Sequence, residues 1–180
     1  MTQIDFSILY WIQDHIVCDA LTPIMKLFTT VGNGGVLWIV LGILLLLFKK
    51  TRRAGIAALV SLALVALLNN EIIKPIVQRP RPFTYTDIEL LITAPGGYSF
   101  PSGHTSSSFA AATAVFLKNK KPGAVLLVCA ALIGFSRMYF FVHFPSDVFV
   151  GMIEGILTAV IVTLLLDHAQ KKAGSTSGKL

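Results

Sequence analysis

Two histidines and one carboxylate are the residues of this sequence best suited to reactive chemistry. His143 and Asp147 are four residues apart in RMYFFVHFPSD, and His104 lies in PSGHTSSSF. Imidazoles titrate near neutral pH, so one ring can attack an electrophile while the other protonates the departing oxygen. Asp147 can accept the ring N–H of His143 and stabilise the positive charge that develops on attack. We therefore expect His143, His104 and Asp147 to be catalytic.

Basic residues accompany these groups and indicate the charge of the substrate. Lys74 and Arg81 occur in KPIVQRPRPF, and Arg137 precedes His143. Cations that converge repel one another unless an anion neutralises them, and the arginine fork matches the oxygens of a phosphoryl group. A helix beginning at Ser102 and Gly103 would add backbone N–H groups and the positive end of its dipole. The predicted phosphate-binding residues are thus Lys74, Arg81, Ser102, Gly103 and Arg137.

A metal centre is the competing interpretation of two histidines and an aspartate. Three nearby cations would disfavour a bound metal ion, and the sequence contains no HExxH motif. We predict no metal and no cofactor. Cys18 and Cys129 lack metal-ligand spacing and are interpreted as small hydrophobic residues.

The elements that must position these residues are membrane helices. Only 13% of the 180 residues are charged, 54% are hydrophobic, and the mean hydropathy is +0.75. Soluble domains average about 25% charged residues. This composition predicts an all-α, polytopic membrane helical bundle with one domain over residues 1–170 and a disordered cytoplasmic tail over 171–180. The acidic N-terminus lacks the basic region of a cleavable signal peptide, so we expect no leader to be removed.

Five segments are predicted to cross the membrane: 36–48, 54–73, 102–118, 124–141 and 147–167. The first is short for a full span, so we expect its crossing to begin near Val31. Prolines 75, 80 and 82 are expected to end the second segment, and Lys120–Gly123 to form a tight turn. The stretch 3–31 is helical in pattern, but its polar residues prevent a clean span. Two interpretations stay open for it: an amphipathic helix in the interface, or a broken helical pair that acts as a sixth membrane helix.

Lysine and arginine clusters set the predicted topology. They fall in three connections, at 49–53, 118–121 and 171–179, which the positive-inside rule assigns to the cytoplasm. The predicted site residues then all lie at the outer helix ends. We expect a multi-pass protein of a bacterial plasma membrane with an extracytoplasmic site. The same clustering argues against a nucleic-acid face and leaves the lipid bilayer as the partner, with no obligate protein partner inferred.

Two further charged residues have no assigned role. Arg79 can snorkel to the interface or contact substrate. Glu154 lies about 10 Å below Asp147 on the same helix face, where it can support the site or line a lateral lipid entrance.

The three polar stretches together resemble a known family signature. They run from Lys74 to Arg81-Pro82, over Pro101-Ser102-Gly103-His104, and from Ser136-Arg137 through His143 to Asp147. Together they are similar to the tripartite motif of the type 2 phosphatidic acid phosphatase superfamily. That superfamily includes undecaprenyl pyrophosphate phosphatases, phosphatidylglycerophosphate phosphatases, glucose 6-phosphatase and vanadium haloperoxidases. The resemblance implies that His143 forms a phosphohistidine, that Asp147 orients it, and that His104 serves as acid and then as base. It also implies that the five binding residues cradle the phosphoryl group without a metal.

The resemblance implies a membrane lipid phosphatase, and compact outer loops favour a lipid head group over a large soluble substrate. Undecaprenyl pyrophosphate is the first choice of substrate. Phosphatidylglycerophosphate and phosphatidic acid remain alternatives. A non-enzymatic phospholipid transporter or scaffold would need the cations but not the two histidines with their aspartate.

Overall fold

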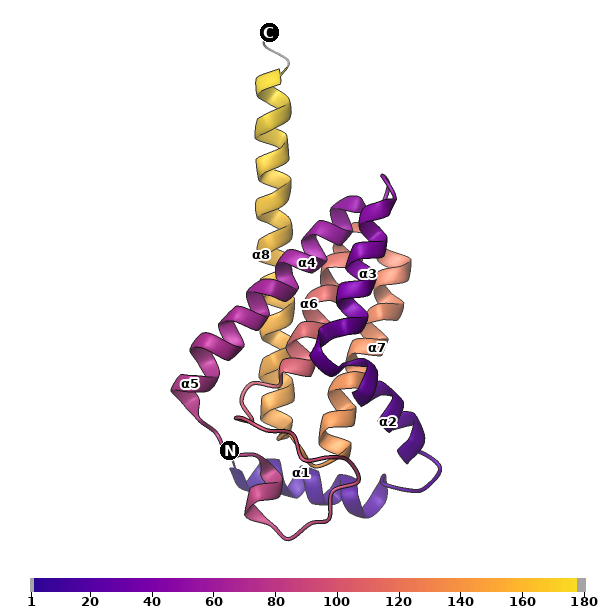
Figure 1. Ribbon diagram of the computed structural model, residues 1–180, viewed down its shortest axis with the longest axis vertical. Coiled ribbons are helices and arrows are strands. Elements are labelled where there is room, and N and C mark those ends of the chain that lie inside the picture. The colour runs from indigo at the N-terminus through magenta and orange to yellow at the C-terminus, as the bar shows by residue number, and fades with distance from the viewer. Residues whose placement is uncertain (1, 178–180) are drawn as a thin grey trace.

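The computed structural model describes residues 2–177, and every regular element within that range is helical (Figure 1). The elements in chain order are α1 (Thr2–His15), α2 (Thr22–Val31), η1 (Asn33–Gly35), α3 (Val36–Leu47), α4 (Arg52–Leu67), the π-helix η2 (Leu68–Ile73), α5 (Lys74–Val77), η3 (Pro82–Tyr85), α6 (Gly103–Lys118), α7 (Lys120–Tyr139) and α8 (Pro145–Ser177). The predicted all-α class is confirmed.

Three helical stretches are long and apolar enough to cross a membrane: 52–85, 120–139 and 145–172. The pair α2 and α3, bent by 48° at the break between them, becomes a fourth if it is counted as one span. The described residues therefore contain three or four candidate spans by length and composition.

Helix α6 forms the centre of the bundle. It packs against α4, α7 and α8, and its residues 108–115 are all buried. Small residues allow this close packing, because a Cβ at Gly155 of α8 would lie 2.4 Å from the Ser106 carbonyl oxygen. A Cβ at Gly151 would lie 2.9 Å from the carbonyl oxygen of Ser102. The helix that carries His104 is thus held against the helix that carries Asp147.

The two ends of the bundle differ in chemistry. At one end, Lys118 forms an ion pair with Asp167, and Arg53 and Lys171 line the same hollow. At the other end lie the start of α6, the end of α7 and the start of α8, with the 82–102 connection wrapped beneath them (Figure 1). The fold therefore separates the basic connections from the predicted site residues.

The N-terminal stretch forms two helices with different roles. Helix α1 lies across the site end of the bundle (Figure 1) and buries Leu9 and Ile12, while Ile4 and Trp11 stay exposed. Helix α2 bends into α3 through Gly32-Asn33-Gly34-Gly35. Gly34 and Gly35 have φ values of 60° and 68°, which side-chain-bearing residues rarely adopt.

Several helix boundaries differ from the predicted ones. The helix from α4 passes through the π-turn and across Pro75, and it ends before Gln78, whose φ is 48°. The predicted Lys120–Gly123 turn is wrong: these residues form the first turn of α7, where the missing N–H of a proline is tolerated. Helix α8 begins at Pro145 and continues to Ser177, into the stretch predicted to be a disordered tail. The last three residues of that stretch lie outside the described residues.

Candidate active site

His143 and Asp147 face each other at the junction of α7 and α8. The Nδ1 atom of His143 lies 3.5 Å from Oδ2 of Asp147, within ion-pair distance, and it forms no hydrogen bond among the described residues. Asp147 Oδ2 also accepts hydrogen bonds from the backbone N–H of Phe144, at 2.9 Å, and from the hydroxyl of Ser99. Both side chains are buried. The carboxylate is therefore fixed beside the ring that it was predicted to orient.

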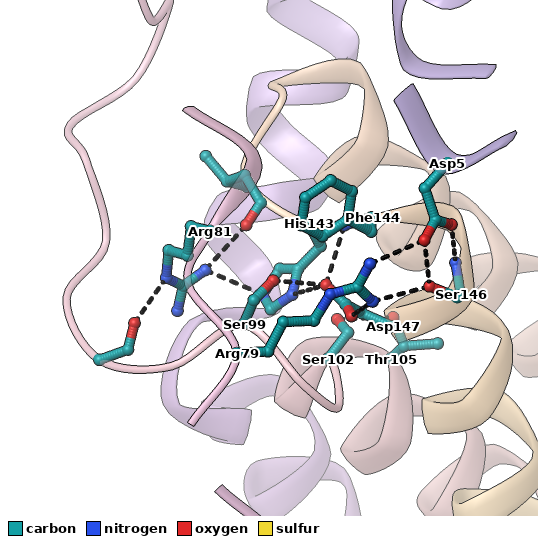
Figure 2. A network of polar contacts seen from close by, with 12 residues as sticks. Asp5, Arg79, Arg81, Ser99, Ser102, Thr105, His143, Phe144, Ser146 and Asp147 are labelled. Carbon is teal, nitrogen blue, oxygen red and sulfur yellow. Dashed lines mark hydrogen bonds and ion pairs between the residues drawn. The ribbon is translucent and has the colours of Figure 1, made fainter. Parts of the chain in front are cut away.

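Arg81 determines which nitrogen of His143 carries the proton. Its Nη1 lies 3.1 Å from Nε2 of His143 (Figure 2), and a guanidinium can only donate. Nε2 is then the acceptor, and the proton of the neutral ring is on Nδ1, facing Asp147. The Nε2 lone pair of His143, which accepts from Arg81, thus points toward the predicted binding cations.

The surroundings of His143 keep its ring neutral. Burial lowers the pKa of His143 from 6.5 to about 4, because the charged ring would lose its hydration. The contact with Asp147 opposes this shift, and the positive charges of Arg81 and Arg137 add to it. At neutral pH the imidazole is therefore unprotonated and able to act as a nucleophile.

Backbone carbonyls hold the guanidinium of Arg81 in place. It donates to the carbonyl oxygens of Gly96, Gly97 and Val142 at 2.9 to 3.0 Å. Two of these carbonyls belong to the connection between η3 and α6, so this connection positions a binding residue.

The predicted binding cations lack acidic partners. Arg137 is buried, donates from Nη1 to the Thr29 hydroxyl, and leaves its Nε without a hydrogen-bond partner. Within the described range, neither Lys74, Arg81 nor Arg137 forms an ion pair with a carboxylate. Buried charges are normally paired, so two buried arginines without ion pairs, together with half-buried Lys74, indicate a site for an anion.

The start of α6 contributes to the same site. Ser102 occupies the N-cap position, as predicted, but its hydroxyl accepts from the Thr105 hydroxyl and makes no capping bond to the backbone. Its own N–H donates to the carbonyl oxygen of Asp147 at 3.1 Å, which ties α6 to α8. A Cβ at Gly103 would lie 3.7 Å from the Nζ atom of Lys74. The Lys74 side chain therefore reaches the first turn of α6.

His104 is held by a residue that sequence reasoning missed. Its Nε2 is 2.9 Å from Oδ1 of Asn33 in the bend between α2 and α3. A Cβ at Gly32 would lie 2.9 Å from the His104 ring, so glycine there leaves room for the imidazole. His104 interacts electrostatically with Lys74, Arg81, Arg137 and His143. The predicted residues from three separate stretches therefore converge.

Arg79 is the second functional contact that the sequence did not assign. Its Nη1 donates to Asp147 Oδ1 at 2.6 Å and to the Ser146 hydroxyl at 2.7 Å, while Nη2 donates to Asp5 Oδ2 at 2.7 Å (Figure 2). In the sequence, the only indication of a role for Arg79 was its place as a basic residue beside Arg81 and two prolines. Arg79 pairs with two carboxylates and therefore differs from the three unpaired cations.

Glu154 belongs to a polar contact below the site. The side-chain amide of Asn69, in the π-turn, lies 2.8 Å from the Ser106 hydroxyl. When the amide of Asn69 is oriented so that its oxygen accepts from the Ser106 hydroxyl, the amide nitrogen donates to the two carboxylate oxygens of Glu154 at 3.1 Å and 3.2 Å. This contact joins α6, α8 and the π-turn of the α4 helix.

A largely apolar cavity adjoins His104. It has a volume of about 370 Å³ and is lined by residues of the 32–35 bend, α3, α4 and the start of α6. Leu59, Leu62 and Ala63 supply apolar lining, and Asn69 and His104 are among its polar groups. The cavity therefore presents an apolar surface next to one of the two predicted catalytic histidines.

The residues that the structure describes include no group of three or more His, Cys, Asp or Glu side chains arranged to hold a metal ion. That the reaction needs no metal stays a prediction. The residues that do converge are two histidines, one carboxylate held by donors, and three cations.

Known proteins are similar in sequence to much of this chain. Residues 54–171 match the PAP2 superfamily. An undecaprenyl-diphosphatase from Sulfolobus acidocaldarius is 36% identical over 120 residues, which are 66% of this chain and 58% of that relative. The chain thus spans less than two thirds of the length of that relative.

Two solved structures share the fold over most of their length. A transmembrane PAP2-type phosphatidylglycerolphosphate phosphatase from Bacillus subtilis superposes with a TM-score of 0.76 at 25% identity, over 93% of this chain and 86% of that one. LpxE from Aquifex aeolicus superposes with a TM-score of 0.71 at 33% identity, over 88% of this chain and 94% of that one.

Proposed function

This chain belongs to the PAP2 superfamily, and from that premise we propose that it is a metal-independent membrane lipid phosphatase acting through a phosphohistidine. The observation that carries the proposal is the set of three cations without carboxylate partners beside His143 and His104. A phosphoryl group is the anion that such forks and a point charge recognise. A binding protein would need the cations but not a nucleophile held by a carboxylate.

In the first step, Nε2 of His143 attacks phosphorus and the bond from phosphorus to the leaving oxygen breaks. Arg81 must first transfer its hydrogen bond from Nε2 to a phosphoryl oxygen. His104, which is protonated in the complex with the anionic substrate, donates a proton to the leaving oxygen, and the lipid alcohol or lipid monophosphate departs. The phosphorylated ring keeps its proton on Nδ1 and is positively charged, so Asp147 stabilises this intermediate.

In the second step, water attacks the phosphohistidine. His104, now neutral, takes a proton from that water as the bond between phosphorus and Nε2 breaks. Inorganic phosphate leaves, and both histidines return to their starting protonation states. Lys74, Arg81, Arg137 and the start of α6, with Ser102 and Gly103, hold the phosphoryl oxygens through both steps.

Undecaprenyl pyrophosphate is our first choice of substrate, with phosphatidylglycerophosphate and phosphatidic acid as alternatives. The apolar cavity beside His104 supports a lipid, because the leaving group must lie on the side of the acid. The undecaprenyl-diphosphatase relative supports an isoprenoid, whereas the Bacillus subtilis structure is a phosphatidylglycerolphosphate phosphatase.

We place five helices across the membrane: α3, α4, α6, α7 and α8. Helix α6 is short and polar for a span, but α4, α7 and α8 shield it from lipid. The exposed apolar residues of α1 suit an interfacial helix. The basic end then faces the cytoplasm, and the site faces the outside of a bacterial plasma membrane.

Phosphate release by the purified protein in detergent tests the proposal. Undecaprenyl pyrophosphate, phosphatidylglycerophosphate and phosphatidic acid are compared with a water-soluble sugar phosphate, each with and without EDTA. We expect lipid hydrolysis that EDTA does not reduce and that His143→Ala abolishes. His168→Ala, which changes an exposed histidine of α8, is the matched control.

Three outcomes would contradict the proposal. Activity in His143→Ala would exclude the proposed nucleophile, and a preference for the sugar phosphate would exclude a lipid substrate. Binding of these lipids without turnover would favour the transporter or scaffold. Rapid acid-free quenching with a ³²P-labelled lipid should also trap a phosphohistidine in the wild type but not in His143→Ala.

A further inference from the structure

Asp5 lies on α1, outside residues 54–171 that match the superfamily, yet it contacts the start of α8 directly. Its Oδ1 accepts the backbone N–H of Ser146 at 3.0 Å, and its Oδ2 accepts the Ser146 hydroxyl at 2.7 Å. An acceptor at an unpaired N–H of a first helical turn acts as a cap. Asp5, on α1, therefore caps the N-terminus of α8 at Ser146, the residue before Asp147.

Arg79 joins Asp5 to the carboxylate beside the nucleophile. The two nitrogens of its fork reach Asp5 Oδ2 and Asp147 Oδ1, both within 2.7 Å (Figure 2). The guanidinium carbon lies 3.9 Å from the centroid of the Phe144 ring, which fixes the plane of the fork. The Asp5 and Asp147 side chains are 6% and 0% exposed, so this contact is largely shielded from water.

The charges of this contact explain why two carboxylates are needed. If Arg79 paired with Asp147 alone, its positive charge would neutralise the carboxylate that must stabilise positive charge on His143. Because Asp5 shares the guanidinium, the group of three retains one net negative charge, and the Oδ2 atom of Asp147, which does not contact Arg79, lies 3.5 Å from His143 Nδ1.

We propose that Asp5 is a positioning residue: acting through Arg79 and Ser146, it sets the orientation and effective charge of Asp147 toward His143. This inference rests on the proposed function and adds to it a contribution from α1. The N-terminal helix thereby becomes part of the catalytic apparatus without touching the substrate.

Kinetics of Asp5→Asn, which removes the charge but keeps the shape, test the proposal. We expect kcat to fall by about 10- to 100-fold with KM changed less than about threefold, as is typical when a partner of a reactive group is lost. Asp5→Glu should recover part of the rate. Asp14→Asn, an exposed acidic residue of the same helix, should match the wild type. An unchanged kcat, or an effect on KM alone, would overturn the proposal.

A spectroscopic measurement separates this inference from the proposed function. In protein labelled with ¹⁵N-histidine, the Nδ1–H proton of His143, assigned by its loss in His143→Gln, should lie downfield in the wild type and move upfield in Asp5→Asn. This signal does not depend on turnover. Unmoved His143 signals would overturn the inference even if the protein is an active phosphatase, and absence of hydrolysis in the wild type would overturn only the proposed function.

A structural role for Asp5 is tested with a second variant. Arg79→Lys keeps the positive charge but cannot fork between two carboxylates, so it should lower kcat and shift the same resonance. Melting temperatures in detergent are measured for every variant. If Asp5→Asn and Arg79→Lys both fail to fold, the contact serves stability and the proposal is wrong.

Discussion

Arg81 donates a hydrogen bond to the Nε2 atom of His143 at 3.1 Å, so the residue predicted to bind phosphate also selects the tautomer of the proposed nucleophile. The same guanidinium is held by three backbone carbonyls. Its position is therefore set before any substrate arrives, which lowers the cost of ordering the site. We therefore expect Arg81 to contribute to both binding and reactivity.

Arg81→Lys should separate these contributions. Lysine keeps the charge but cannot reach the carbonyls and the imidazole together, so we expect kcat/KM to fall by about 10²-fold, with kcat reduced as well as KM raised. Steady-state phosphate release measures both constants. Arg53→Lys, at the opposite end of the bundle, is the matched control. A change confined to KM would show that Arg81 only binds.

Asn33→Ala should impair the acid step specifically. Without the Asn33 side chain the His104 ring loses its 2.9 Å partner, so protonation of a poor leaving group becomes slower. We expect kcat for a lipid phosphate to fall about tenfold, with a much smaller loss for an aryl phosphate, whose leaving group needs little protonation. Asn119→Ala, at the link between α6 and α7, is the control. Equal losses on both substrates would contradict an orienting role.

The lowered pKa of His143 predicts a loss of stability at acidic pH. In the folded protein the ring protonates at about 4, whereas an unfolded chain takes up the proton near 6.5. The unfolded state therefore binds more protons between these values, and the free energy of unfolding should decrease as pH falls from about 6.5 to about 4. Melting temperatures across this window test the direction, and His143→Gln should flatten the dependence. A ¹⁵N titration placing the His143 pKa at or above 6.5 would contradict it.

Gly155→Ala should destabilise the protein even though alanine favours helices by about 1 kcal/mol over glycine. The added Cβ would lie 2.4 Å from the Ser106 carbonyl oxygen and 2.8 Å from the Ala110 nitrogen, and backbone atoms cannot move aside as a side chain can. Overpacking of this kind costs about 1–3 kcal/mol. Thermal unfolding in detergent measures the effect. Gly96→Ala, whose Cβ meets no atom within 4 Å, should leave the melting temperature nearly unchanged.

Residues of the candidate site could be singled out from the sequence because charged and titratable side chains are costly in an apolar chain unless they have a function. His143 and Asp147, four residues apart at a helix start, stood out for this reason, and the structure brings them to 3.5 Å. The residues that support them were not predictable. Asn33 lies in a glycine-rich break that indicates only a bend, and Thr29, which accepts from Arg137, is one polar residue in an apolar helix.

The helical membrane class, the separation of basic connections from polar helix ends, and the grouping of two histidines, an aspartate and three cations could all be predicted from the sequence. These follow from hydropathy, charge and spacing, which are local properties of the chain. The position of α1 across the site end, where Asp5 and Arg79 meet at Asp147, is seen only in the folded structure. That contact joins residues far apart in the chain, and packing of α1 on the bundle, which no local pattern encodes, brings them together.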